Sequence, residues 1–345
     1  MNEKAYIQGG KVIEANEQFK HVMAITLNPK SNYKEGVLRC ITSRSGDLSF
    51  RGNIDRSELH KISGESLGKF IISEKLNLRN EDKITQELNG KDLDLLGLED
   101  PDIFIDERTG LTHLYFTMPF HNKKFEDKSL TYLGHAVGTD LNYLEMTNPV
   151  LMVDKLGDGA KEVSIAPMNS KGFRYNLVES SKKEDDFVYS TVRIVVAHDM
   201  GGSWEYGEVA FHPKEHNLSW IAGHSSPGPL LPKSFIDVGK GKLLGIINGC
   251  EANQKVGDDI KYGNFSIGLF IYDYENGKIN WVSETSFIKD TEAGRNGGRA
   301  ITFASQFVET DPGKGILYAH VDDSFVRSYT LNVEGIKKLL PVNFF

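Results

Sequence analysis

Two adjacent carboxylates, Glu99 and Asp100, stand directly before the run Pro101-Asp102-Ile103-Phe104-Ile105. Proline stiffens the step into that run, and its apolar side chains must enter a core, so we expect the carboxylates at the mouth of a β-strand. Carboxyl groups presented in this way suit general acid catalysis on sugars. The residue types therefore direct attention to the elements that would hold such acids around a substrate.

Composition restricts the class of protein that carries these acids. The chain has 345 residues, a net charge of −8 and a pI near 5.7, which argues against nucleic-acid binding and gives no support for binding an anionic membrane. No leader-like segment or membrane-spanning apolar run occurs, so we expect a cytoplasmic protein unless a signal peptide was removed. Cys40 and Cys250 are expected to be reduced, buried thiols. No metal or cofactor is predicted, and homo-oligomerisation is left open.

Short apolar runs recur between clusters of Gly, Asn, Asp and Pro, a pattern typical of the strands and turns of an all-β fold. A coarse repeat organises them: a polar residue beside Pro or Ala, an apolar run, a turn at Gly, and an aromatic-rich strand. The repeat begins roughly every 60 to 75 residues, at Asn28, Asp100, Glu162, Ser226 and Ala300.

Five such units predict a five-bladed β-propeller, a single domain over 1–345. Residues 55–95 are polar and are expected to form an insertion or long loop, with room for a short helix. Residues 333–340 have helical spacing and predict a short C-terminal helix. In a propeller the innermost strands line a central funnel, so the five openings are expected to meet at one site. A β-sandwich with a second domain is the alternative.

Four segments, in order and with compatible spacing, resemble glycoside hydrolase family 130, whose members are five-bladed propellers acting mainly on β-mannosides and related to family 43. The resemblance runs from about residue 19 to residue 340. The four segments are Gly97-Leu98-Glu99-Asp100-Pro101, Lys161-Glu162 through Ala166-Pro167, Trp220 through Pro227-Gly228-Pro229, and Tyr318 through Asp322-Asp323-Ser324.

The resemblance implies roles for individual residues. Asp100 corresponds to the family's proton donor, and a funnel floor shared with Glu99 and Asp102 would raise its pKa. Asp323 corresponds to an aspartate that meets the sugar. The expected substrate-binding residues are Glu99, Asp102, Lys161, Glu162, His224, Asn248, Asp323 and Arg44, with Arg39 as an alternative to Arg44. The expected partner is an oligosaccharide.

Two departures from the family concern phosphate. Val178-Glu179 stands where the phosphorylases have His-Arg, and Asn248 through Glu251 replaces a Tyr-His-Gly segment. Replacing a cation by a carboxylate repels phosphate. The sequence therefore favours activation of water, with Glu179 or Glu251 as the general base of an inverting hydrolysis.

The prediction is thus an inverting glycoside hydrolase acting on β-mannosides or related oligosaccharides. Three alternatives stay open. An inorganic-phosphate-dependent β-mannoside phosphorylase would build its anion site from Arg174, Arg295 and Arg299. A family 43-like arabinosidase or xylosidase would use Asp100 differently. A non-catalytic carbohydrate-binding propeller stays open because Asp102 replaces the family's Arg.

Overall fold

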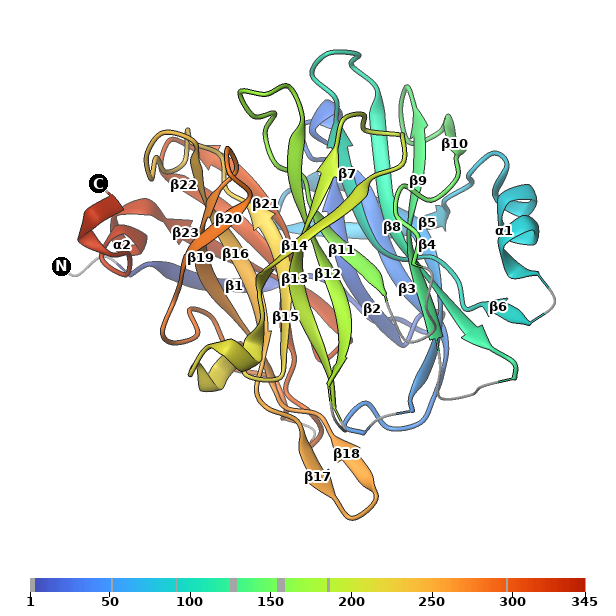
Figure 1. Cartoon of the computed structure of the whole chain (residues 1–345). Helices are drawn as coiled ribbons and strands as arrows, with labels where there is room; N and C mark the ends of the chain where they lie inside the picture. Colours follow the sequence, from blue (N-terminus) through green and yellow to red (C-terminus); the bar gives the residue numbers. More distant parts are fainter. Residues whose placement is uncertain are drawn as a thin grey trace.

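The computed structural model describes residues 4–50, 52–90, 92–124, 129–153, 159–184, 187–295 and 297–344. These residues form mainly β-strands (Figure 1), which confirms the predicted all-β class. The described α-helices are α1 (Glu81–Asn89) and α2 (Val333–Lys337). Helix α2 begins where the C-terminal helix was predicted, because the Asn332 side chain accepts hydrogen bonds from the Glu334 and Gly335 N–H groups.

Consecutive strands pair antiparallel and form the sheets. One sheet contains β2 (His21–Leu27), β3 (Glu35–Ser45), β4 (Ile54–Ser66) and β5 (Lys69–Lys75). The next contains β6 (Leu93–Leu95), β7 (Glu99–Ile105), β8 (Thr112–Asn122), β9 (Ser129–Gly138) and β10 (Leu144–Met146). The last contains β21 (Thr302–Asp311), β22 (Lys314–Val321), β23 (Phe325–Asn332) and β1 (Tyr6–Glu14). The N-terminal strand β1 therefore completes the C-terminal sheet by pairing with β23.

A larger sheet joins two four-stranded sets. The first set is β11 (Ala160–Ser164), β12 (Arg174–Glu184), β13 (Phe187–Ala197) and β14 (Glu205–Phe211). The second is β15 (His224–Leu230), β16 (Lys242–Cys250), β19 (Phe265–Asp273) and β20 (Lys278–Val282). They touch through one parallel pair, Ser190 with His224. A separate hairpin, β17 (Gln254–Val256) and β18 (Asp259–Lys261), extends away from the sheets (Figure 1).

Five strands, β2, β7, β11, β15 and β21, form the inner wall of the molecule. Strand β2 lies against β7, β7 against β11, β11 against β15, β15 against β21, and β21 again against β2. The contacts thus close on themselves. Each of the five is the strand of its set nearest the centre, so side chains at equivalent positions converge from distant parts of the sequence.

The core consists of apolar layers between successive sets of strands. Leu59 packs with Phe116 between the first and second sets, and Leu133 packs with Val178 between the second and third. Further clusters join Leu177 with Ile247, Leu269 with Leu317, and Val326 with Ile25. These layers bury one face of each sheet against its neighbour, which is the main source of stability in such a structure.

Each inner strand contains a shift of register that faces the centre. The shifts fall at Met23/Ile25, Glu99/Asp102, Lys161/Val163, Pro227/Leu230 and Ala304/Gln306. In three of them the displaced residue is left-handed: Ala24 and Asp100 at φ 46°, and Glu162 at φ 48°. A β-bulge re-aims a side chain. The bulges therefore place Asp100 and Glu162 at equivalent positions on neighbouring strands.

Two sequence expectations differ from the structure. The expected insertion or long loop at 55–95 is mostly the strands β4 and β5, and α1 is the short helix for which the sequence left room. The polar composition of this segment arises because these elements lie away from the centre and bury only some of their side chains, such as Leu59 and Ile62. The first repeat also begins earlier in the chain than the predicted Asn28. Asn28 caps a short 3-10 turn, and the residue equivalent to Asp100 is Ala24.

Candidate active site

Residues from all five inner strands line one axial cavity of about 160 Å³. Ala24, Asp100, Glu162, Pro227 and Ser305 each contribute one wall. The predicted convergence of the distant segments therefore occurs, with Asp100, Asp102 and Glu162 among the lining residues. The acids come from the beginnings of β7 and β11, and the rest of the lining extends from there along the inner strands as far as Phe104, Ile165, Leu230 and Phe307.

Arg39 on β3 holds the two carboxylates that the sequence singled out. Its Nη1 donates to Asp100 Oδ1 at 2.8 Å and its Nη2 to Glu99 Oε1 at 2.6 Å. Ser57 accepts from Arg39 Nε at 3.0 Å and donates to Glu99 at 3.1 Å. Burial raises the pKa of Glu99 to about 7, with a further rise from the Asp100 charge, while Arg39 acts in the opposite direction. One arginine thus serves two buried acids.

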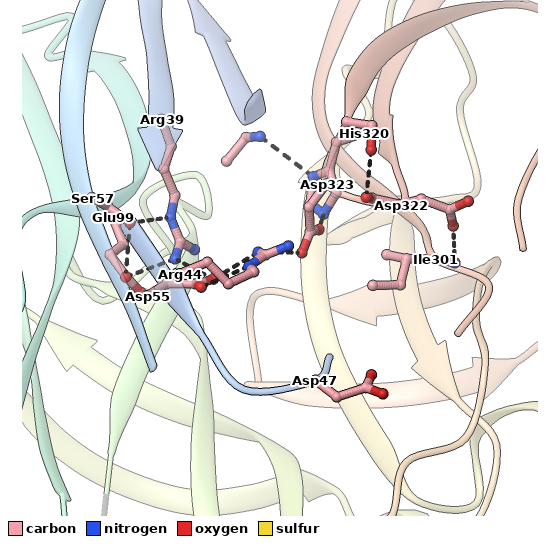
Figure 2. Close-up of polar contacts among 12 residues, drawn as sticks. Arg39, Arg44, Asp47, Asp55, Ser57, Glu99, Ile301, His320, Asp322 and Asp323 are labelled. Atoms are coloured by element: carbon pink, nitrogen blue, oxygen red, sulfur yellow. Dashed lines mark hydrogen bonds and ion pairs between the residues drawn. The ribbon is translucent and has the colours of Figure 1, made fainter. Parts of the chain in front are cut away.

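A second ion cluster joins the first and last sets of strands. Figure 2 shows Arg44 between Asp55 and Asp323; its Nε and Nη2 donate to Asp55 at 2.7 Å each, and its Nη2 lies 3.0 Å from Asp323. His320 Nε2 lies 3.6 Å from the other Asp323 oxygen. The ring accepts a hydrogen bond at Nδ1 from the Ala24 N–H, so the proton of the neutral ring is assigned to Nε2. The predicted residues Arg44 and Asp323 therefore lie in one cluster.

A third cluster lies on β11, β12 and β15. The buried Glu179 carboxylate has one oxygen 3.1 Å from Lys161 Nζ and the other 3.0 Å from His224 Nε2. Burial alone would raise the pKa of Glu179, but His224 and Lys161 hold it well below its usual range. Phe265 meets the His224 ring edge-on at 4.9 Å. Three residues predicted separately, Lys161, Glu179 and His224, are thus in direct contact.

Two acids of the axial cavity lie in an environment that favours the protonated form. Burial raises the pKa of Asp102 to about 7. Burial also raises the pKa of Glu162, and the nearby charges of Asp100 and Glu179 add to that effect. The cavity floor is therefore less negative near neutral pH than its three carboxyl groups suggest.

Two residues predicted for the site, Glu251 and Asn248, make their side-chain hydrogen bonds outside the three ion clusters. The Glu251 side chain accepts from Asn264 Nδ2 at 2.9 Å and is 43% exposed, in the loop after β16. The buried Asn248 side chain donates to Ala304 O at 3.0 Å and accepts from Ala304 N at 2.8 Å. Asn248 therefore fixes β16 to the inner strand β21 behind the cavity wall.

Sequence reasoning missed Asp55, Ser57 and His320, which complete the first two clusters. Asp55 and Ser57 are two residues apart on β4 and share one side of the strand, a signal hidden by the treatment of 55–95 as a loop. His320 lies within a segment that the family resemblance did cover, but the sequence did not reveal its contacts with Ala24 and Asp323.

Within the described ranges, no group of three or more His, Cys, Asp or Glu side chains is arranged to hold a metal ion. Cys40 and Cys250 are free and buried. Neither described α-helix is long or apolar enough to cross a bilayer.

No family model and no curated protein matches the sequence. Solved structures do match. A glycosyl hydrolase from Bacteroides ovatus is 14% identical, with a TM-score of 0.66 and 95% of each chain covered. A second structure has the same identity, TM-score and coverage. It comes from a study which reports that the GH130 family of mannoside phosphorylases contains glycoside hydrolases that target β-1,2 mannosidic linkages in Candida mannan. A β-1,2-mannobiose phosphorylase from Listeria innocua is 10% identical, with a TM-score of 0.61, covering 98% of this chain and 94% of the other. The chain therefore has the fold of the glycoside hydrolase family 130 enzymes.

Proposed function

We propose that this protein is an inverting glycoside hydrolase of β-mannosides, with its active site at the mouth of the axial cavity. The observation that carries the proposal is the proximity of three carboxyl groups: Asp100 and Glu162 line the axial cavity, and the charges of Asp100 and Glu179 both act on Glu162. Acids on either side of a scissile glycosidic bond are the requirement of this chemistry. Two of the similar structures named above concern β-1,2-linked mannosides, so such a linkage is the first substrate to test.

The architecture that we propose is a single five-bladed β-propeller. The cyclic contacts of the inner strands support it, as do the apolar layers between successive sets of strands. In this arrangement the blades beginning with β2 and β7 supply Arg39, Glu99 and Asp100, and the next two supply Lys161, Glu179 and His224.

Asp100 is the proposed proton donor. Arg39 holds its Oδ1, and the side chain lines the cavity, which leaves Oδ2 available to a ligand. Asp100 shares Arg39 with Glu99, whose pKa burial raises to about 7, so the two neighbouring carboxyl groups compete for one cation. Asp323 and Arg44 are proposed to bind sugar hydroxyls beside it.

The water-activating side is proposed to be the Glu179 cluster. Inversion needs the acid and the base about 6.5–9.5 Å apart, with water between them. Lys161 contacts Glu179, and the negative charges of Glu179 and Asp100 both raise the pKa of its ammonium group. The two carboxylates therefore interact with the same cation. Glu251 is the weaker candidate because its carboxylate already binds Asn264.

The contacts of Glu179 favour water over phosphate as the nucleophile. Its carboxylate occupies the space between Lys161 and His224, the cationic or donor groups that an incoming phosphate would need. The three arginines that a phosphorylase would use to bind phosphate already donate to other groups. Arg174 donates to Ala166 O and Glu107, and Arg295 donates to Thr291 O. Arg299 bonds to Gly263 O and Cys250 Sγ.

The test is product analysis with β-1,2-mannobiose in the presence and absence of inorganic phosphate, followed by proton NMR from the first minutes. We expect phosphate-independent release of mannose whose first-formed anomer is α. Phosphate-dependent formation of mannose 1-phosphate would instead establish the phosphorylase. Cleavage of an arabinofuranoside but no mannoside would establish the family 43-like activity, and Asp100→Asn should abolish turnover in either case.

A further inference from the structure

The proposed hydrolysis needs a group that accepts the proton of the attacking water, and Glu179 is poorly suited to do so itself. Its side chain is only 1% exposed, and its two oxygens face Lys161 and His224. A carboxylate neutralised in this way binds a proton weakly, and a general base works best with a pKa near the working pH. Water also has no open approach to either oxygen.

Of the two members of this cluster that can accept a proton, His224 is more exposed than Glu179; Lys161 is 37% exposed but carries a cationic ammonium group. The His224 side chain is 19% exposed, and it begins β15 at the same end of the molecule as Asp100. Nε2 faces Glu179 Oε2 at 3.0 Å. No hydrogen bond to Nδ1 is formed by any residue of the described ranges, and Nδ1 is not among the buried unpartnered atoms. The accessible nitrogen of this histidine is therefore Nδ1.

The hydrogen bond to Glu179 determines the state of the ring. A carboxylate can only accept, so Nε2 carries the proton and the neutral ring presents a lone pair at Nδ1. The charged or titratable groups around His224 are Glu179 on β12, Lys161 on β11 and Arg299 before β21, with Cys250 paired to it on β16. Burial lowers the pKa of His224, Glu179 opposes this, and Lys161 and Arg299 lower it further, so the ring is neutral at pH 7.

We infer that His224 Nδ1 is the catalytic base of the proposed hydrolysis and that Glu179 is a positioning residue that orients the ring. Water oxygen forms the bond to the anomeric carbon, and the water proton passes to Nδ1. The glycosidic C–O bond breaks, and the departing oxygen takes the proton of Asp100. The imidazolium is held by Glu179 until it releases its proton to solvent, and Asp100 is then reprotonated. This inference rests on the proposed function, which it makes more specific.

Chemical rescue tests the assignment. We expect His224→Gly to lower kcat by about 10²–10⁴-fold and added imidazole to restore part of it, more so as pH rises and imidazole becomes neutral. His320→Gly is the matched control, because His320 is also a histidine beside a carboxylate and packed on a phenylalanine; imidazole should not raise its rate. Rescue of Glu179→Gly by formate or azide, with no rescue of His224→Gly by imidazole, would overturn the inference and make Glu179 the base.

The pH profile separates positioning from a merely structural role. Removing the Glu179 charge in Glu179→Gln should move the acidic limb of kcat/KM to lower pH, because the anion no longer favours the imidazolium. An unmoved limb overturns the inference.

An activity-independent measurement keeps the inference separate from the proposed function. Nitrogen-15 NMR of the wild-type protein, with His224→Gln to assign the signal, should show a neutral ring protonated at Nε2 at pH 7. A ring protonated at Nδ1, or an imidazolium, overturns the inference even if the protein cleaves mannosides. Absence of cleavage of every glycoside, with the ring as expected, would reject the hydrolase instead.

Discussion

At the scale of single residues, Arg39 neutralises two buried acids. Both Glu99 and Asp100 rely on its guanidinium, and Asp55 lies 4.0 Å away. Removing one partner of a buried ion pair leaves a charge without compensation, which costs far more than the intact pair contributes. The geometry also needs a planar fork, which lysine lacks.

We expect Arg39→Gln to lower the free energy of unfolding by about 3–5 kcal/mol at pH 8. The loss should be smaller at pH 5, where the freed carboxyls take up protons. Urea unfolding at the two pH values measures this. Arg56→Gln is the control, since the exposed pair with Asp94 should contribute under about 1 kcal/mol. Equal losses in the two variants would contradict the role assigned to Arg39.

Asp102 should make stability depend on pH. Its pKa is about 7 in the folded protein because of burial, above its ordinary value. Between the ordinary value and 7, the folded state retains a proton that the unfolded state has released, so stability falls as pH rises through this range. Asp102→Asn should therefore match the wild type at pH 4 and be more stable at pH 8 by about 1–3 kcal/mol, measured by thermal unfolding.

The pKa of Asp106 is lowered in the folded protein, whereas that of Asp102 is raised. Burial alone would raise the pKa of Asp106, but hydrogen bonds from Arg108 N–H and the Thr109 hydroxyl lower it. Its charged form is favoured in the folded state, so Asp106→Asn should lose stability at pH 7 and lose less at pH 3. The same pH trend in both variants would contradict this account.

Individual residues differ in how well the sequence alone revealed them. Asp323 and Glu179 were found because segments around them resembled a family, and the structure places both in ion clusters. The sequence did not reveal that Asn248 joins two strands, because a buried amide with that task looks, in a sequence, like an amide that binds a ligand. The contact between Lys161, Glu179 and His224 depends on tertiary pairing, so no local pattern reports it.

At the scale of elements, the bulges of the inner strands position the acids. Ala24 occupies in β2 the place of Asp100 in β7, with the same left-handed φ of 46°. Alanine in that conformation costs roughly 1–2 kcal/mol. The sequence could not predict this position, because alanine carries no polar signal and the nearby Asn28-Pro29 pair does.

The bulge makes a contrast between two alanines testable. Ala24→Gly should be neutral within about 0.5 kcal/mol, because relief of the left-handed strain offsets the lost methyl group. Ala304→Gly, at a buried position of β21 without a positive φ, should lower stability by roughly 1–2 kcal/mol. Chemical unfolding of the two variants measures the difference, and identical losses would contradict strain at Ala24.

At the scale of the whole molecule, the repeat in the sequence predicted the convergence of five segments, and the inner strands do meet. The first unit was shifted in phase, and its outer strands were taken for a loop, because outer strands with one exposed face lack a strong apolar pattern. The pairing of β1 with β23 was not predicted, since it joins opposite ends of the sequence.

The neighbouring ends make the chain suitable for circular permutation. Asn332 N–H donates to Ala5 O at 3.0 Å, and both termini lie on one side in Figure 1. A permutant that joins the ends by a short Gly-Ser linker and opens at Gly239, in the turn after β15, should keep the native circular dichroism spectrum and turnover. Deleting 6–14 should instead give a protein without a cooperative unfolding transition. A folded, active deletion variant would contradict this expectation.

The pairing of β1 with β23 also has a consequence for biosynthesis. Strand β1 is made before the other described strands but finds its partner only after β23 has left the ribosome, so during translation an unpaired strand edge and the apolar layers beside it stay open to solvent. Nascent protein should therefore be most vulnerable to aggregation, and most dependent on chaperones, just before β23 emerges from the ribosome.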